Sequence, residues 1–308
     1  MADNKPLLSI CLPTNGAVQF VTKALDSIYA QEDADRSKYE VFITDNGQDS
    51  QLEAALQPYI KHGNLRYLKT NDKGFLNLIT CLKLGRGLFC KMLNHRSVLI
   101  PGSIQAWIEM VEHYKETQPV IYCTDHCLKG DDVIECHNFD TFIREMSIYS
   151  SWSAGIGVWD KDKQILDKIE CNEMFPNASL LFEMRQDGEY VIWNKKYQNM
   201  MEEPTKGGYN IFHTFGVVYL DLLRDLENRG RITYTTFNVV RKDLLRFLSG
   251  WYYSLCLRKN SYTFDTSGME NHMLVYYSKQ ELMWFKQRAR LQFIGRIKAL
   301  VLKLIRKR

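Results

Sequence analysis

Two short apolar segments near the amino terminus, each ending in a polar turn, constrain the fold of this chain most. Residues 7–16 read LLSICLPTNG and residues 39–50 read YEVFITDNGQDS. Between them, residues 18–30 carry apolar side chains at the three- and four-residue steps of a helix, namely Val18, Val21, Leu25 and Ile28. A strand, a helix and a strand form a βαβ unit, so we expect the two strands to lie parallel, with both turns at one edge of a sheet.

This edge is the expected ligand site. Ligands of open α/β sheets bind in the crevice outside the carboxyl ends of the strands. The turns at residues 13–16 and 45–47 both lie there, so the sequence predicts a nucleotide site. Further strands are predicted near residues 65–69 and 89–93, and others within residues 120–126 and 189–197.

The predicted fold class is α/β, with a mixed but mostly parallel, Rossmann-like sheet flanked by helices. Residues 1–208 are expected to form this domain, with a nucleotide-binding half at 1–120 and an acceptor half at 121–208. Residues 209–308 are predicted to be a helical region that ends in a basic amphipathic helix.

The small net charge of +4 conceals an asymmetry along the chain. Residues 285–308 contain nine Lys or Arg and no acid, which leaves 31 basic and 36 acidic side chains in residues 1–284. The body of the protein is therefore mildly acidic and its tail strongly basic.

The tail combines this charge with apolar side chains at helical spacing, which are Trp284, Leu291, Ile294, Ile297, Val301, Leu304 and Ile305. Basic residues occupy much of the rest, including Lys286, Arg288, Arg290, Arg296, Lys298, Lys303 and Arg306. Such a helix is typical of binding in the interface of an anionic membrane. The alternatives are a surface helix packed on its own domain or a basic arm for nucleic acid. Nucleic acid is disfavoured because no basic patch elsewhere accompanies the tail.

Other features indicate a cytoplasmic protein without a membrane span. No run of apolar residues is long enough to cross a bilayer, and the first residues, MADNKPLLS, lack the basic and apolar regions of a signal sequence. The eight cysteines have no framework spacing, so we expect reduced thiols and no zinc site.

The pieces LSICLPTNG, ALDSIYAQ and VFITDNGQDS, followed by NLRYLKTNDKGFLNLITCLKLGRG and LIPGSIQAWIEMV, resemble the family 2 glycosyltransferases of the GT-A fold. They occur in family order across residues 7–111; beyond, the likeness is weaker and closest to bacterial enzymes that build capsule or O-antigen sugars. The resemblance implies transfer of a sugar from a nucleoside diphosphate sugar, with UDP as the first choice and dTDP as the alternative. It further implies a lipid-linked saccharide acceptor at the inner membrane.

The resemblance also assigns nucleotide contacts. Asp45 would accept the imide hydrogen of uracil or thymine, with the backbone of Pro13 and Thr14 lining the same pocket; the plainer interpretation of residues 45–47 is a turn. Further nucleotide-sugar contacts are expected from Asn15, Asn46, Asn71, Lys73, Gly74, Asn77, Asn94 and His95.

The sequence departs from the family at the metal motif. Relatives carry Asp-x-Asp before the Pro-Gly of LIPGS, and those positions are Asn94 and Arg96 here. An amide and a guanidinium make a poor Mg or Mn site, so we expect no metal cofactor and Arg96, together with His95, neutralising the leaving diphosphate. The alternatives are an inactive domain, or a divalent ion held by acids elsewhere.

The resemblance places the catalytic base as an acid shortly before a helix on the acceptor side. Pro176 suits the first position of such a helix, and Glu173 just before it is the first choice. Asp125 is the second choice, and the alternative is that both are solvated loop acids. Attack assisted by Glu173 from the face opposite the leaving group would invert the anomeric carbon.

Two other functions remain open. A GT-A domain without activity could bind nucleotide sugar or act as an assembly scaffold. A nucleotidyltransferase would use the same crevice, but it needs metal-binding acids that the sequence lacks at the expected positions.

Overall fold

The computed structural model of the chain describes residues 5–185, 187–204 and 206–305, with the backbone alone over 297–305. The chain forms two compact units, Met1–Glu202 and Glu203–Arg308, which are described separately below. The domain boundary expected from the sequence, after residue 208, lies a few residues beyond the boundary between these two units.

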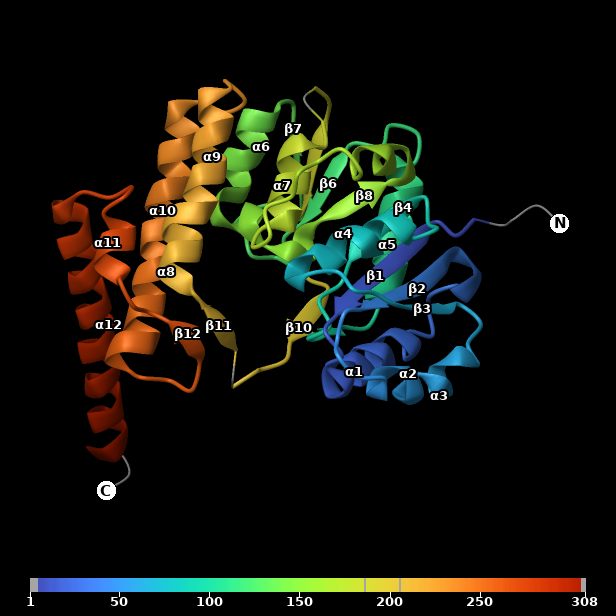
Figure 1. The fold of residues 1–308 in the computed structure, drawn as a ribbon, viewed down its shortest axis with the longest axis horizontal. Coiled ribbons are helices and arrows are strands. Elements are labelled where there is room, and N and C mark those ends of the chain that lie inside the picture. Colours follow the sequence, from blue (N-terminus) through green and yellow to red (C-terminus); the bar gives the residue numbers. More distant parts are fainter. Residues whose placement is uncertain (1–4, 186, 205, 306–308) are drawn as a thin grey trace. The chain divides into compact units, whose positions relative to one another are not determined.

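The first unit contains a five-stranded sheet in the order β3-β2-β1-β4-β8 (Figure 1). Its strands are β1 Leu8–Thr14, β2 Tyr39–Asp45, β3 Leu65–Lys69, β4 Phe89–Met92 and β8 Gly157–Trp159. Strand β1 pairs in parallel with β2 and β4, β2 pairs in parallel with β3, and β8 runs antiparallel to β4. Because the chain leaves the sheet at β3 and returns on the other side of β1, the gap between β1 and β4 is a topological switch point.

Smaller sheets extend this unit. Strand β9 pairs in parallel with β6 and antiparallel with β7, and β10 pairs antiparallel with β5. Their bounds are β5 Ser97–Leu99, β6 Val120–Cys123, β7 Val133–Cys136, β9 Tyr190–Trp193 and β10 Gln198–Met200.

The α-helices of the first unit are α1 Val18–Tyr29, α2 Gln51–Ala55, α3 Gln57–Ile60, α4 Asn77–Leu84, α5 Ser103–Tyr114, α6 Phe139–Met146 and α7 Pro176–Glu183. Short 3₁₀ turns occupy Arg36–Lys38, Gly74–Leu76, Ser147–Ser151, Ser153–Gly155 and Asp160–Ile165.

Alternate residues of the central strands face opposite layers of helices. Leu8, Ile10 and Leu12 of β1 belong to one apolar cluster with residues of α1 and α5. The intervening Cys11 donates to the carbonyl of Cys81 in α4. Figure 1 accordingly shows α1 and α4 on opposite sides of β1 and β2. Burial on both faces explains why these strands are almost continuously apolar rather than alternating.

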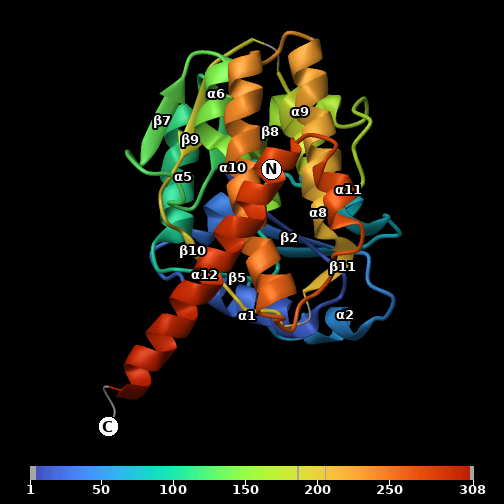
Figure 2. The same ribbon diagram turned by 90° about the vertical axis from the view of Figure 1, so that its left-hand side faces the viewer.

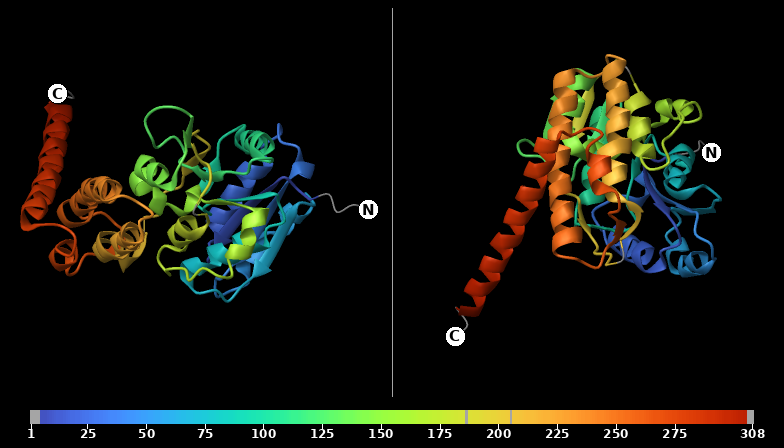
Figure 3. Two further views of the ribbon diagram at one scale, coloured as in Figure 1. Left: turned by 90° about the horizontal axis from the view of Figure 1, so that it is seen from above. Right: turned by 60° about the vertical axis from the view of Figure 1, so that its left-hand side comes forward.

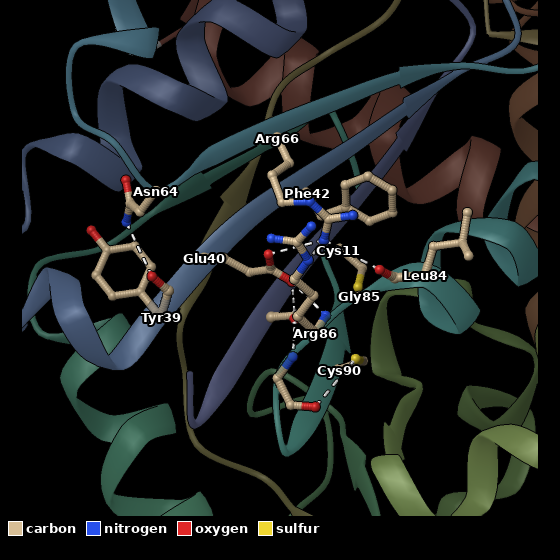
Figure 4. Close-up of polar contacts among 12 residues, drawn as sticks. Cys11, Tyr39, Glu40, Phe42, Asn64, Arg66, Leu84, Gly85, Arg86 and Cys90 are labelled. Carbon is tan, nitrogen blue, oxygen red and sulfur yellow. Dashed lines mark hydrogen bonds and ion pairs between the residues drawn. The ribbon is translucent and has the colours of Figure 1, made fainter. Parts of the chain in front are cut away.

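A buried polar network closes the amino-terminal edge of the sheet, opposite the candidate site (Figure 4). The Glu40 carboxylate accepts from Ser9 Oγ at 2.6 Å, from an Arg66 guanidinium nitrogen at 3.1 Å and from the Arg86 backbone at 2.5 Å. Gly87 then donates its backbone N–H to Ser9 Oγ. A Cβ on Gly87 would lie 2.4 Å from the Ser9 nitrogen, so only glycine fits this close approach.

The second unit is mainly helical. Its helices are α8 Ile211–His213, α9 Tyr219–Asn228, α10 Tyr234–Tyr252, α11 Met269–Met273 and α12 Lys279–Ile305. Helices α9 and α10 run side by side (Figure 2), and the carboxyl-terminal end of α12 extends beyond the other helices of this unit (Figure 3). π-Helical turns at Thr214–Val218 and Tyr253–Leu257 follow α8 and α10.

The α/β fold class predicted from the sequence is confirmed, as are strands at all six predicted positions. The short parallel pair β11 Gly207–Asn210 and β12 Thr263–Asp265 was not predicted. In the part of the chain that is described, no helix is both long and apolar enough to span a membrane.

Candidate functional site

The loops after β1 and β4 meet at the switch point of the sheet. His95 Nδ1 lies 3.0 Å from Thr14 Oγ1, and its ring stacks on that of Phe20 in α1 with centroids 6.0 Å apart. The backbone N–H of Leu93 donates to the Cys11 carbonyl at 2.7 Å, which holds the end of β4 against β1. Two residues singled out in the sequence, Thr14 and His95, are thus brought into direct contact.

His95 is uncharged at neutral pH. Burial, reinforced by the neighbouring positive charge of Arg96, lowers its pKa from 6.5 to about 4. A role for His95 beside Arg96 at the leaving group stays a prediction, and as a neutral ring His95 would act there through hydrogen bonding while Arg96 supplies the positive charge. A neutral imidazole still offers a hydrogen bond to Thr14.

Arg96 stands on a hydrogen-bonded turn. Its backbone N–H donates to Asn94 Oδ1 at 2.9 Å, and its carbonyl accepts from Met201 at 2.8 Å. The amide oxygen of Asn94 is therefore used inside the turn. Together with the guanidinium of Arg96, it does not fit a divalent cation, which prefers carboxylate oxygens. Among the described residues, no three His, Cys, Asp or Glu side chains are grouped to hold a metal ion.

Asp45, the candidate for base recognition, ends β2 and is completely buried. One carboxylate oxygen accepts from the Gly47 backbone at 2.7 Å, and the other accepts from Tyr67 Oη at 3.0 Å and from Lys69 Nζ at 2.9 Å. Burial and the hydrogen bond to Asp45 raise the pKa of Tyr67. The turn after β2 and the edge strand β3 are therefore held together by this one carboxylate.

Tyr67 and Lys69 were not singled out in the sequence. Lys69 is the direct partner of Asp45 in the pairing of β3 with β2, and Tyr67 precedes it by two residues on the same face. If the register between β2 and β3 had been known, both residues could have been placed beside Asp45 from the sequence. The sequence alone does not specify that register.

Two asparagine side chains tie three loops together. Asn46 Nδ2 donates to the carbonyls of Asp72 at 2.9 Å and Gly74 at 2.8 Å. Asn77 Nδ2 donates to the carbonyls of Thr14 at 3.1 Å and Thr44 at 2.9 Å. These amides position the loops after β1, β2 and β3 relative to one another.

The remaining donor-side candidates lie around these loops. Asn15, Asn71, Lys73 and Gly74 are exposed, and Gly74 has a φ of +51°, a left-handed conformation that favours glycine. Pro13 lies within β1 opposite Thr44 of β2. The exposed members of this group lie outside the strands, in the loops that follow β1 and β3 at the carboxyl edge of the sheet.

The two candidate bases differ sharply in their surroundings. Asp125 is 8% exposed, and its carboxylate accepts from the backbone of Tyr197 at 2.9 Å and Gln198 at 3.2 Å and from Lys196 Nζ at 2.8 Å. Glu173 is exposed on the turn before α7, and Pro176 begins that helix. Glu173 Oε1 lies 2.7 Å from Lys73 Nζ, so the preferred base contacts the donor-side loop, whereas Asp125 organises the connection from β9 to β10.

A buried cation lies within β4, in the strand that leads to Asn94. The side chain of Lys91 is completely buried and donates to the carbonyls of Met92, at 2.8 Å, and Ala154. Its ammonium also lies over the rings of Trp107 and Tyr197. Burial lowers the pKa of Lys91. The sequence does not show whether a single lysine in an apolar strand is buried, as Lys91 is, or exposed at the surface.

All eight cysteines are free thiols. Three of them, Cys11, Cys81 and Cys90, are fully buried beside β1 and α4. Burial raises the pKa of Cys11 well above its ordinary value. Cys11 is therefore a protonated packing residue.

In the second unit, the basic helix α12 exposes the apolar positions that the sequence singled out. Trp284, Leu291 and Ile294 are 41%, 61% and 48% exposed. Phe285 and Ala289 are buried instead, and the ring of Phe285 contacts Tyr252. The face that packs on this unit is thus not the one predicted for the membrane. The side chains of Ile297, Lys298, Val301, Lys303, Leu304, Ile305 and Arg306 lie outside the described residues.

The sheet order and its switch point define a GT-A-like α/β fold, and comparison with solved structures agrees. Residues 1-349 of S. aureus TarS in complex with UDP-GlcNAc align with a TM-score of 0.54 and 14% identity, covering 92% of this chain and 81% of that chain. The Pyrobaculum calidifontis mannosyltransferase PcManGT, in complex with GDP-Man and Mn2+, aligns with a TM-score of 0.51 and 13% identity, covering 99% and 88%. Both are glycosyltransferases of GT-A-like fold.

Sequence comparison gives one weaker finding. An uncharacterized glycosyltransferase of Rickettsia prowazekii (strain Madrid E) is 24% identical over 119 residues, which are 38% of this chain and 36% of that protein. The match thus spans about a third of the relative. No protein-family model matches the chain.

Proposed function

We propose that this protein is a glycosyltransferase that moves a sugar from a nucleoside diphosphate sugar to a saccharide acceptor. The observation that carries the proposal is the meeting of Thr14, His95 and Arg96 at the switch point of a GT-A-like sheet. UDP is the first choice of nucleotide and dTDP the second. The neighbouring TarS structure in complex with UDP-GlcNAc supports a donor of this class.

The chemistry needs positive charge where the diphosphate departs. Arg96 can supply it, since a guanidinium offers fork-shaped donors that match phosphate oxygens. Because Asn94 and Arg96 stand where relatives carry metal-binding acids, we propose that transfer is independent of a divalent ion. His95, neutral and bonded to Thr14, would hold the two loops that border the diphosphate.

The acceptor hydroxyl must lose its proton as it attacks. We assign this step to Glu173, whose exposed carboxylate contacts Lys73 of the donor-side loop, rather than to Asp125, whose carboxylate already bonds two backbone amides and Lys196. The acceptor oxygen bonds to the anomeric carbon, the bond to the diphosphate breaks, and the proton passes to Glu173. Attack from the face opposite the diphosphate inverts the anomeric configuration.

The exposed apolar and basic side chains of α12 support a membrane-bound acceptor. Trp284, Leu291 and Ile294 face solvent, and Arg288 lies over the Trp284 ring at 5.7 Å. Such a surface is suited to the interface of an anionic bilayer. We therefore propose peripheral attachment to the cytoplasmic face of the inner membrane and a lipid-linked acceptor, as in family 2 enzymes of capsule or O-antigen synthesis.

A donor screen followed by a turnover assay tests the proposal. The protein is mixed with UDP-, dTDP- and GDP-sugars, and the shift in melting temperature is measured for each. Sugar release or transfer from the best donor is then measured with excess chelator. Stabilisation by a UDP- or dTDP-sugar and turnover in chelator are expected.

Each other outcome has a defined meaning. Turnover that requires added Mg or Mn refutes the metal-independent mechanism. Binding without turnover favours the alternative of an inactive scaffold, and release of pyrophosphate from a nucleoside triphosphate would indicate a nucleotidyltransferase.

A further inference from the structure

Two exposed charges from different loops of the first unit form an ion pair. Lys73 Nζ lies 2.7 Å from Glu173 Oε1, and the two side chains are 74% and 58% exposed. One residue belongs to the loop after β3 and the other to the turn before α7, so the contact joins the donor loop to the acceptor side. These are the lysine expected to contact the donor and the carboxylate proposed as the base.

The backbone that carries Lys73 is fixed on both sides. The amide of Asn46 donates to the carbonyl of Asp72, just before Lys73, and to that of Gly74, just after it. Asn46 itself follows Asp45 at the end of β2. The lysine can therefore change partner by rotating its own flexible side chain, without movement of the loop.

The backbone of Glu173 is fixed in a comparable way. Asn172 Oδ1 accepts from the backbone of Met174 at 2.9 Å, and the backbone N–H of Asn172 donates to Ser179 Oγ in α7 at 3.0 Å. Glu173 thus stands on a closed turn against the first helical turn of α7. Both partners combine a rigid backbone with an exposed side chain.

We propose that Lys73 restrains Glu173 in the free enzyme and exchanges it for the donor's diphosphate, so that the base is released only when donor is bound. This inference rests on the proposed function. A diphosphate carries more negative charge than one carboxylate and competes for the same ammonium. The ion pair would keep Glu173 from activating a hydroxyl while no donor is bound. Binding of the donor would then free the carboxylate when a sugar is in place.

The exchange has a consequence that can be measured without turnover. Binding of UDP must break the ion pair and place a second anion near Glu173, and both effects oppose binding. Removing the Glu173 charge should therefore strengthen UDP binding, although the same change removes the proposed base. A residue that merely contacts the acceptor would have no such effect.

The experiment is a double-mutant cycle on UDP affinity, measured by isothermal titration calorimetry. Glu173→Gln is expected to bind UDP about two- to five-fold more tightly than wild type, the range for loss of an exposed ion pair. Lys73→Met is expected to bind UDP more weakly, and Glu173→Gln in the Lys73→Met background should give a clearly smaller gain. Glu170→Gln, which removes an exposed acid from the same segment, should leave affinity unchanged.

Unchanged or weaker UDP binding by Glu173→Gln overturns the inference, as does a gain that persists undiminished in the Lys73→Met background. A comparable gain in Glu170→Gln also overturns it, because the effect would then be general electrostatics. Absence of UDP binding by the wild-type protein refutes a UDP-sugar donor itself. Circular dichroism of each variant confirms that it is folded.

Discussion

Replacing His95 should change how the stability of the first unit depends on pH. The pKa of His95 is lowered from 6.5 to about 4 by burial and by Arg96. As pH falls below 6.5, the unfolded chain binds a proton at this residue while the folded protein does not. The stability conferred by neutral His95 is therefore complete above pH 6.5 and is lost as pH falls toward 4.

The size of this loss follows from the two pKa values. Each unit of difference in pKa corresponds to about 1.4 kcal/mol, so the loss should reach about 2 kcal/mol at pH 5 and about 3 kcal/mol at pH 4. His95→Asn is a suitable replacement because its amide can bond Thr14 from the position of Nδ1 but does not titrate. The variant should lack this part of the pH dependence.

The free energy of unfolding is measured with urea near pH 7.5 and near pH 5 for wild type and His95→Asn. We expect the wild type to lose about 2 kcal/mol more than the variant over this interval. His62→Asn is the control, since His62 lies at the surface against Tyr29 and its titration should affect stability much less. Equal pH dependence of wild type and His95→Asn, or a His95 ring resonance in NMR spectra that titrates near 6.5, would refute the reasoning.

Three further perturbations test other parts of the molecule. Arg96→Ala should lower turnover by about 10²- to 10³-fold, because it removes charge stabilisation at the leaving group, while UDP affinity changes less; unchanged turnover in a steady-state assay removes Arg96 from the mechanism. Glu40→Gln should lower the free energy of unfolding by about 1.5–3 kcal/mol without changing UDP affinity, because charged hydrogen bonds are lost at the far edge of the sheet; equal urea midpoints for the variant and wild type would contradict this role. Trp284→Gln combined with Leu291→Gln should weaken binding to anionic vesicles by about tenfold or more, since two exposed apolar side chains are lost; undiminished co-sedimentation would place the membrane contact elsewhere.

The central fold could be predicted because its signals are local and repeated. The residues of β1 and β2 form continuous apolar runs, and α1 between them has apolar side chains at helical spacing. Topology rules then place the polar turns after Thr14 and Asp45 at one edge. By contrast, β11 contains the sequence GGYN and β12 has three residues, so neither shows a strand pattern.

The composition of the site was easier to predict than the bonding within it. The sequence identified Asp45 at the carboxyl edge, but not that Tyr67 and Lys69 would occupy one of its oxygens. Those contacts depend on the register between β2 and β3, which a polar turn does not specify. Nor does composition reveal burial, which makes His95 neutral although it stands beside a polar loop.

The structure separates residues that build the crevice from residues that remain available to a ligand. The side chains of Asp45, Asn46 and Asn77 bond loops of the protein itself, so their hydrogen-bonding capacity is largely used before any ligand arrives. Lys73 and Glu173, by contrast, pair with each other at the surface, and a pair of this kind contributes little to stability. Because it is weak and exposed, the pair is readily exchanged for a ligand's charge.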